Sequence, residues 1–237
     1  MNKIYKFLIT LLAAGFISGT ALAGTFNIGF VGSSSTWDTE GTEFEGDENG
    51  GGGPRDKRST DGSNSKDVEY PSIFVEYTMG EGAGGNMTIG IEYIPGDASL
   101  GSKARTDAND ENSGSNDGTY TAKAMVEDHM TLYLEPTWMM TDNFGAFFTV
   151  GASHVEVISQ ESIALGTDSS AYGDAGAWGG MVGAGFKMQT AAGLFAKVDV
   201  RGTRFETIKL KSSTGNKNTI HATPEEVKAR LAIGWAF

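Results

Sequence analysis

The chain has no cysteine, only 3 histidines and only 5 prolines among its 237 residues. Without cysteine it can form no disulfide, so one way of stapling a small exported fold is excluded. Scarce proline argues against a collagen-like chain or a proline-rich linker. After residue 23 no segment offers the roughly twenty consecutive apolar residues of a membrane-spanning helix.

Glycine is abundant at 34 residues, only 39% of residues are hydrophobic, and the formal net charge is −12. On a helical interpretation this composition indicates a soluble protein. On a barrel interpretation it is expected, because only alternate residues of each strand need be apolar. The glycines suit a tightly curved sheet with small residues facing its interior.

The N-terminus has the pattern of a secretory signal peptide. Lys3 and Lys6 precede a short apolar run at residues 7–17, and Ala21 and Ala23 form an A-x-A cleavage pattern. We expect cleavage after Ala23, which leaves residues 24–237 as one barrel domain. The mature chain loses two lysines, so its formal charge is −12 − 2 = −14.

The last eleven residues alternate strictly between apolar and polar or small side chains. The apolar phase is Val227, Ala229, Leu231, Ile233, Trp235 and Phe237. A strand has a side-chain period of two, so these residues share one face. An apolar terminal strand that ends on an aromatic residue is typical of a barrel in the outer membrane of a Gram-negative bacterium, where that face meets lipid.

Seven further segments alternate in the same way between Gly, Asn or Asp clusters. The eight predicted strands are 25–34, 69–79, 86–94, 121–139, 144–157, 176–188, 194–205 and 227–237. The connections 35–68, 95–120, 158–175 and 206–225 are long and polar, and those between them are short. This rhythm predicts an all-β, eight-stranded, antiparallel up-and-down transmembrane barrel with short periplasmic turns and long extracellular loops.

A soluble, lipocalin-like barrel is the alternative architecture. It is also up-and-down with eight strands, but its apolar faces line the interior. That inversion would crowd many large apolar side chains into a narrow lumen and leave Phe237 unexplained.

The polar phase of the strands predicts a charged lumen. An eight-stranded barrel is wide enough only to be filled by side chains or to hold a small ligand. Buried charges need partners, so we expect an ion-pair network, with Asp199 between Arg201 and the pair Lys228 and Arg230. Its predicted members are Glu76, Glu92, Glu135, Lys187, Lys197, Asp199, Arg201, Lys228 and Arg230. The alternative is a narrow, gateable porin-like channel for ions or small solutes.

Aromatic residues fall near the predicted strand ends, as in the girdles of membrane barrels. The expected outer girdle is Tyr70, Tyr93, Tyr120 and Trp178, and the expected periplasmic girdle is Tyr77, Trp138 and Trp235.

The glycine-rich hairpin of residues 178–188 and 194–201 resembles that of OmpA-type and opacity-protein-like eight-stranded barrels, and residues 231–237 are similar to their assembly signal. The resemblance implies insertion by the barrel-assembly machinery, which would read Leu231, Ile233, Trp235 and Phe237. No peptidoglycan-binding domain follows Phe237, so anchoring to the cell wall is not expected.

The connections 35–68 and 95–120 are acidic and polar, and we expect the loops to be displayed to a host surface or a phage. The connection 206–225 is basic, with Lys209, Lys211, Lys217 and His221, and is expected to contact lipopolysaccharide phosphates or to pair with the acidic loops. Asp107, Asn109 and Glu111 alternate like calcium ligands. However, the loop lacks the glycine and the distal glutamate of an EF-hand, so this candidate is weak. We expect no cofactor, no other metal and no nucleic-acid partner.

No catalytic constellation closes in the sequence. Ser153 and His154 are adjacent and therefore face opposite sides of a strand, and His129 with Thr131 and Tyr133 fits lumen filling. The sequence thus predicts a non-enzymatic barrel with a structural or surface-interaction role.

Overall fold

A computed structural model describes residues 24–44, 59–82, 85–107, 118–163, 172–211 and 219–237. These segments form nine strands and no helix, so no described helix could span a membrane. The strands are β1 (Gly24–Phe44), β2 (Ser59–Gly82), β3 (Gly85–Asp107), β4 (Gly118–Met139), β5 (Phe144–Ile163), β6 (Ala175–Gln189), β7 (Leu194–Phe205), β8 (Ile208–Lys211) and β9 (Thr219–Ala236).

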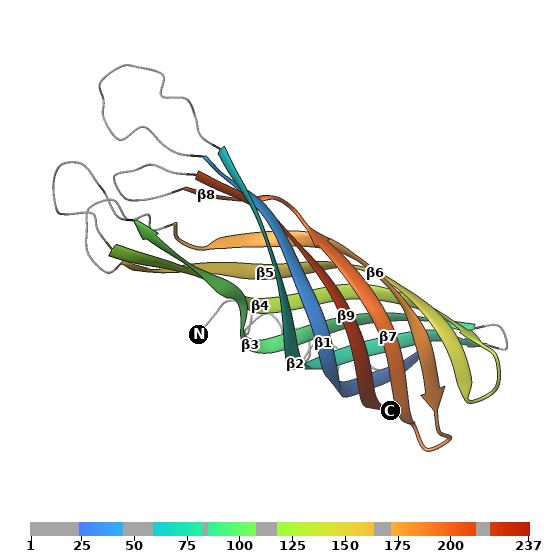
Figure 1. The fold of residues 1–237 in the computed structure, drawn as a ribbon. Coiled ribbons are helices and arrows are strands. Elements are labelled where there is room, and N and C mark those ends of the chain that lie inside the picture. The colour runs from blue at the N-terminus through green and yellow to red at the C-terminus, as the bar shows by residue number, and fades with distance from the viewer. Residues whose placement is uncertain (1–23, 45–58, 83–84, 108–117, 164–171, 212–218) are drawn as a thin grey trace, which may run out of the picture.

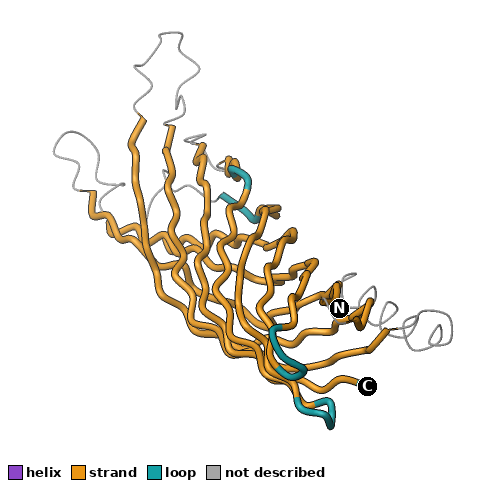
Figure 2. Tube along the Cα trace, turned by 90° about the vertical axis from the view of Figure 1, so that its right-hand side faces the viewer, coloured by secondary structure: helices purple, strands orange, loops and turns teal. Residues whose placement is uncertain are grey.

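Eight of the strands close into a barrel. Each strand from β1 to β6 pairs antiparallel with the next one in sequence, and β9 pairs with both β7 and β1 (Figure 1). Within the described residues the short strand β8 pairs only with β9, and it lengthens the wall at one end. Figure 2 shows short turns at the barrel end that also carries the C-terminus. The predicted all-β, up-and-down architecture is confirmed.

A belt of large apolar side chains surrounds this end of the barrel. It includes Ile28, Phe30, Leu132, Leu134, Phe148, Val150, Val182, Phe186, Val198, Val200, Leu231 and Ile233, all exposed. Phe30 is 73% exposed and Phe148 43%, whereas Phe147, on the opposite phase of β5, is 3% exposed. Such a continuous apolar surface is unfavourable in water and matches the lipid-facing band of a transmembrane barrel.

Beyond the belt the pattern inverts, and the strands continue with their apolar residues inside. Trp37, Val126, Val155 and Phe205 point inward there, while outward positions such as Asp38 are charged and exposed. We call the resulting cluster the outer core. Its buried members are Trp37, Leu100, Val126, Val155, Val157, Tyr172, Ala177, Phe205, Ile208 and Leu210. In the outer part of the molecule the apolar side chains therefore face the interior and the polar ones face solvent. This is the arrangement of the soluble barrel that the sequence analysis considered as an alternative.

This inversion explains why the predicted strand boundaries were wrong. Residues 35–44, 59–68, 95–107, 118–120, 158–163, 208–211 and 219–225 belong to strands, although the sequence predicted loops there. Where their side chains are described, the outward residues are mostly polar, and most of the apolar residues lie on the phase that is polar within the belt. Consequently the apolar and polar residues exchange phase at the edge of the belt, and in the sequence this exchange looks like the end of a strand.

Two residues of the predicted outer girdle are also misplaced. Tyr70 and Tyr93 are buried, at 9% and 8% exposure. Tyr70 lies on the inward phase of β2 with Ser72 and Phe74, and the Tyr93 hydroxyl donates to Asp128 Oδ1 at 3.4 Å. Trp138, Trp178 and Trp235 are exposed on the lipid side, and the side chain of Tyr120 lies outside the described set.

Candidate functional site

The lumen inside the belt is lined by buried charges. The acids are Glu76, Glu92, Glu135, Asp199 and Glu226, and the bases are Lys187, Lys197, Arg201, Lys228 and Arg230. Their formal charges sum to zero, since five acids face five bases. Glu226 was missed by the sequence, because the predicted last strand began one residue later, at Val227.

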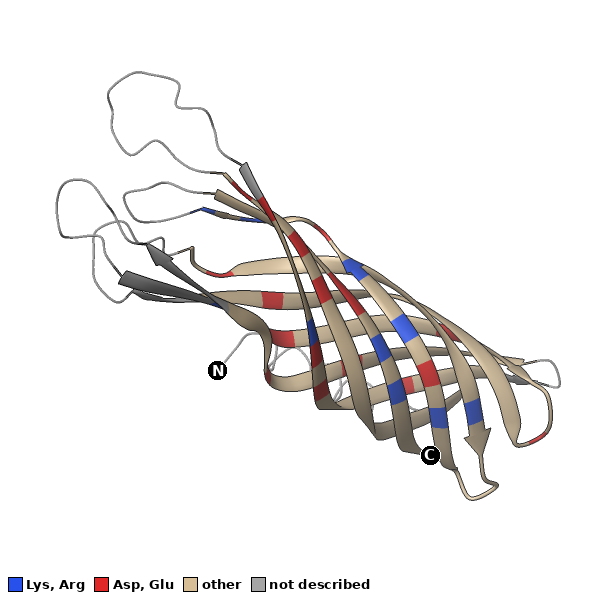
Figure 3. Cartoon of the chain, in the orientation of Figure 1, with Lys and Arg blue, Asp and Glu red and all other residues tan. Residues whose placement is uncertain are grey.

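The bases lie on one wall of the barrel, and most of the acids lie on another. All five bases come from β6, β7 and β9, while three of the acids come from β2, β3 and β4 (Figure 3). Ion pairs therefore cross the lumen and join strands that are far apart in the sequence. In a narrow bore removed from water, such pairs are needed to offset the cost of burying each charge.

At the periplasmic level, one lysine serves two carboxylates. Lys197 Nζ lies 2.6 Å from Glu76 Oε1 and 2.6 Å from Glu135 Oε1. The Tyr133 hydroxyl also donates to Glu76 Oε1, at 2.7 Å. This group links β7 to both β2 and β4 across the bore.

In the middle of the lumen, two arginines share two acids. Arg230 Nη2 lies 2.7 Å from Glu92 Oε2, and Arg201 Nη1 lies 3.3 Å from the same oxygen. Asp199 Oδ1 accepts hydrogen bonds from Arg201 Nε at 2.8 Å and from Arg230 Nη1 at 2.9 Å. Asp199 thus lies between the two arginines.

At the outer level, Glu226 pairs with Lys228, which the sequence analysis had expected to lie beside Asp199. Its Oε2 lies 3.4 Å from Lys228 Nζ. Its Oε1 accepts hydrogen bonds from Ser35 Oγ at 2.9 Å and from the hydroxyl of Tyr70. The charged groups of the lumen thus form three stacked levels.

Aromatic rings close both ends of this charged section. The inner lid consists of Phe74, Phe147 and Phe195, and Lys197 Nζ lies 5.5–5.8 Å from all three ring centroids. Lys187 Nζ lies 4.7 Å from the ring of Phe195. Cations over aromatic faces are attracted by the ring quadrupole, so this lid also holds the two lysines.

The outer lid consists of Trp37, His129 and Phe205, at the base of the outer core. The Trp37 and Phe205 rings stack with centroids 5.4 Å apart, and His129 lies edge-on to both, at 5.9 and 6.2 Å. From the sequence, His129 was expected to fill the lumen, but the other lid residues were not predicted, because inward aromatic residues such as Phe195 and Phe205 of β7 have no distinguishing spacing.

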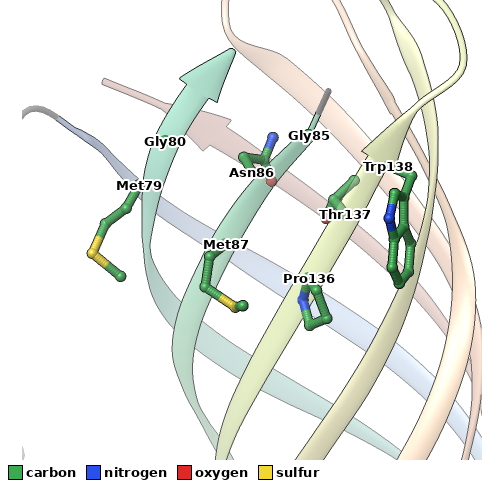
Figure 4. A pocket seen from close by; sticks show the side chains of 8 residues that line it. All are labelled: Met79, Gly80, Gly85, Asn86, Met87, Pro136, Thr137 and Trp138. Atoms are coloured by element: carbon green, nitrogen blue, oxygen red, sulfur yellow. The ribbon is translucent and has the colours of Figure 1, made fainter. Parts of the chain in front are cut away.

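A shallow groove lies on the lipid side near the periplasmic end. Met79, Met87, Pro136 and Trp138 of β2, β3 and β4 border it (Figure 4). Pro136 falls in a gap of the β4–β5 ladder, between the pairs Leu134↔Val150 and Thr137↔Phe147. Since proline has no N–H to donate, the gap follows from the sequence.

The predicted assembly signal lies at the closing strand of the barrel. Leu231, Ile233 and Trp235 are exposed on the lipid face, and Phe237 is 74% exposed. The Phe237 amide donates to the carbonyl of Phe26 at 2.8 Å, so the last residue joins the first strand.

The remaining candidates from the sequence are the calcium loop, the signal peptide and the pair Ser153 and His154. The signal peptide lies outside the described residues. The same holds for Asn109 and Glu111 of the calcium candidate, and only the backbone of Asp107 is described. Among the residues whose side chains are described, no three His, Asp or Glu are placed to hold a metal ion. The Ser153 hydroxyl is within 2.8 Å of the Thr131 hydroxyl, whereas the His154 ring packs on Trp178, with centroids 4.8 Å apart.

No family model and no curated protein matches the chain. Among solved structures it is similar to the attachment invasion locus protein Ail of Yersinia pestis in complex with the heparin analogue sucrose octasulfate. The identity is 10%, over 84% of this chain and 98% of that one, with a TM-score of 0.35. OprG of Pseudomonas aeruginosa gives 15% identity, 91% and 97% coverage, and a TM-score of 0.46.

The translocator domain of the autotransporter NalP of Neisseria meningitidis gives 13% identity, 99% and 96% coverage, and a TM-score of 0.36. These identities and TM-scores are low. It is therefore the closed order of eight strands and the apolar belt that identify the chain as an eight-stranded barrel of the outer-membrane type.

Proposed function

We propose that this protein is an integral outer-membrane barrel with a structural and surface-interaction role and a lumen filled by side chains. The observation that carries the proposal is the charged section closed by aromatic lids at both ends. A barrel built to conduct would keep a wet path, whereas this bore is occupied by paired charges and rings. We propose no enzymatic activity and no cofactor.

In this proposal the chain is exported by its signal peptide, residues 1–23, and inserted by the barrel-assembly machinery through Leu231, Ile233, Trp235 and Phe237. The exposed side chain of Phe237 supports this role, since it makes little contribution to packing in the finished barrel. Outer-membrane lipid and lipopolysaccharide then cover the belt.

The outer extension of the barrel supports the surface role. β1 and β2 continue about ten residues past the belt, which at roughly 3.3 Å per residue lifts their ends about 30 Å along the strands. The outer core makes this extension a packed body. The connections at its tip are thereby presented to partners outside the cell, such as a host surface or a phage.

A narrow channel is the second candidate function. The observation that favours it is the stack of three charged levels along the bore, because exchange of ion pairs between levels would offer a path for ions. Both lids would have to move for this path to open.

Liposome swelling and planar-bilayer recording test the choice. We expect the pure protein to give no uptake of small solutes above empty liposomes and no single-channel steps. A variant that combines Phe74→Ala and Phe195→Ala with Trp37→Ala and Phe205→Ala removes two rings from each lid and serves as a positive control for a widened bore. Reproducible steps from the native protein would overturn the filled-lumen proposal in favour of the channel.

A further inference from the structure

The barrel wall has an open seam between β2 and β3. Their ladder stops at the pair Ile73↔Tyr93, although β2 extends on to Ser59 and β3 to Asp107. Past this rung, in the described residues, β2 pairs only with β1 and β3 only with β4. We define the seam as residues 65–72 of β2 and residues 94–99 of β3. The two strands diverge there in Figure 1.

Prolines explain where the seam begins. Pro71 and Pro95 each lie two residues past the last rung, on facing strands. Proline cannot donate to a ladder, so it is tolerated at an open edge and ends pairing with a neighbour. The far end of the seam is closed by one side-chain hydrogen bond, from Asn64 Nδ2 to the carbonyl of Leu100.

The two edges of the seam differ in their regularity. β3 is interrupted by irregularities between Ile94 and Asp97 and between Ser99 and Gly101, with Gly96 at φ 93° and Gly101 at φ 121°. Such bulges protect an edge against pairing. β2, in contrast, keeps an unbroken register with β1 along its whole described length. An open, regular strand edge is the structure to which an extended peptide adds in β-augmentation.

The seam is bordered by negative charge. Asp67 and Glu69 are exposed on β2 and Asp97 is exposed on β3, so these three acids outnumber the one exposed base of the seam, Lys66. Glu127 of β4 lies outside the belt, where partial burial and the negative charges of Asp97 and Asp128 raise its pKa. A second copy of this chain would bring the same acids, so repulsion disfavours self-pairing and complementarity favours a basic partner.

We propose that the open edge of β2, residues 65–72, is a docking site for an extended, basic segment of a partner protein. This inference rests on the surface-interaction role proposed above. The segment adds as a strand, its main chain bonding the free edge of β2. Alternate side chains lie over Val68 and Tyr70 on the inner side, and the others meet Asp67 and Glu69 on the outer side.

The test uses the full mature chain in detergent micelles and a fluorescent octapeptide of alternating lysine and threonine. Binding is measured by fluorescence anisotropy, with empty micelles as the blank. We expect saturable binding to the protein, weaker at high salt, and none for an octapeptide of alternating glutamate and threonine. The basic peptide with N-methylated backbone amides should also fail, because it keeps the charge and loses the ladder hydrogen bonds.

Two variants test the location of the site, and a third is their control. Glu69→Lys should weaken binding of the basic peptide about five-fold or more, as expected when a rim charge is reversed. Asp142→Lys, in a turn at the opposite end, makes the same charge change and should have no effect. Pro71→Val leaves the charge unaltered and lets β2 pair further with β3, so it should also weaken binding.

Equal binding by the N-methylated peptide, or no effect of Glu69→Lys or Pro71→Val, would overturn the docking site. A conducting lumen in the liposome test would overturn the proposed function and leave this binding result unaffected, so the two failures are distinguishable.

Discussion

At the scale of single residues, the most constrained group in the lumen is the Lys197 ammonium. It is the cation that lies within 2.6 Å of both Glu76 and Glu135, and all three side chains are nearly inaccessible. Removing one member of a buried ion pair leaves an unpaired charge in a low dielectric, which costs more than the pair contributes.

We therefore expect Lys197→Met to lower the free energy of unfolding by about 3–5 kcal/mol. The measurement is urea unfolding in lipid vesicles, followed by tryptophan fluorescence. Lys209→Met, at an exposed position of β8, is the control and should have little effect. Adding Glu76→Gln and Glu135→Gln to the Lys197→Met variant should restore much of the loss. Failure of this rescue would show that packing, and not charge, sets the role of Lys197.

At the scale of elements, each strand carries two amphipathic patterns of opposite phase. On β1, Ile28 faces lipid and Asn27 the lumen, whereas further along Asp38 faces solvent and Trp37 the outer core. The outer core should therefore be stabilised by the hydrophobic effect in water, independently of the lipid around the belt.

Trp37→Ala tests this independence. A buried tryptophan truncated to alanine typically costs about 3–5 kcal/mol, through lost burial and the cavity left behind. We expect hydrogen exchange to accelerate in residues 35–44 and 59–68, while amides in the belt stay protected. Trp138→Ala, on the lipid face, should leave exchange in the outer segments unchanged. Loss of protection throughout the barrel would show that the two parts unfold together.

Glu127 of β4, which lies outside the membrane, makes a pH-dependent contribution to the stability of the fold. The folded-state pKa of Glu127 is raised by partial burial and by nearby acids, so its ionised form is disfavoured in the folded protein. Stability from this group is present at low pH and is lost as pH rises through the folded pKa. Glu127→Gln should thus raise stability at pH 7, by at most about 0.5 kcal/mol because the charges are exposed and screened.

This gain should disappear near pH 4, where the native glutamate is itself protonated. The control variant is Glu40→Gln. Glu40 lies on the outer face of β1, opposite Ser63 of β2 and Thr223 of β9. A gain from Glu127→Gln that persists unchanged at pH 4 would contradict the electrostatic explanation.

At the scale of the whole molecule, the sequence predicted the closed barrel and the inward phase within the belt. Period-two alternation suffices for both, because lipid and lumen impose opposite demands on successive side chains. It did not predict the outer strands, since beyond Ser34 on β1 the same period continues with its faces exchanged. Nor could it pair Lys197 with Glu76, which is 121 residues away, because cross-lumen partners depend on barrel closure and strand stagger.

The exchange of faces along each strand also fixes how deeply the barrel is immersed. Sinking by one side-chain repeat would bring Asp38 and Glu69 toward the hydrocarbon. Rising by the same distance would lift Phe30, at the outer edge of the belt, toward water and draw the turn at Asp142 toward the hydrocarbon. Both displacements raise the free energy, so the position of the protein along the bilayer normal is set by the chain itself. A membrane of different thickness would have to adapt to the barrel rather than the reverse.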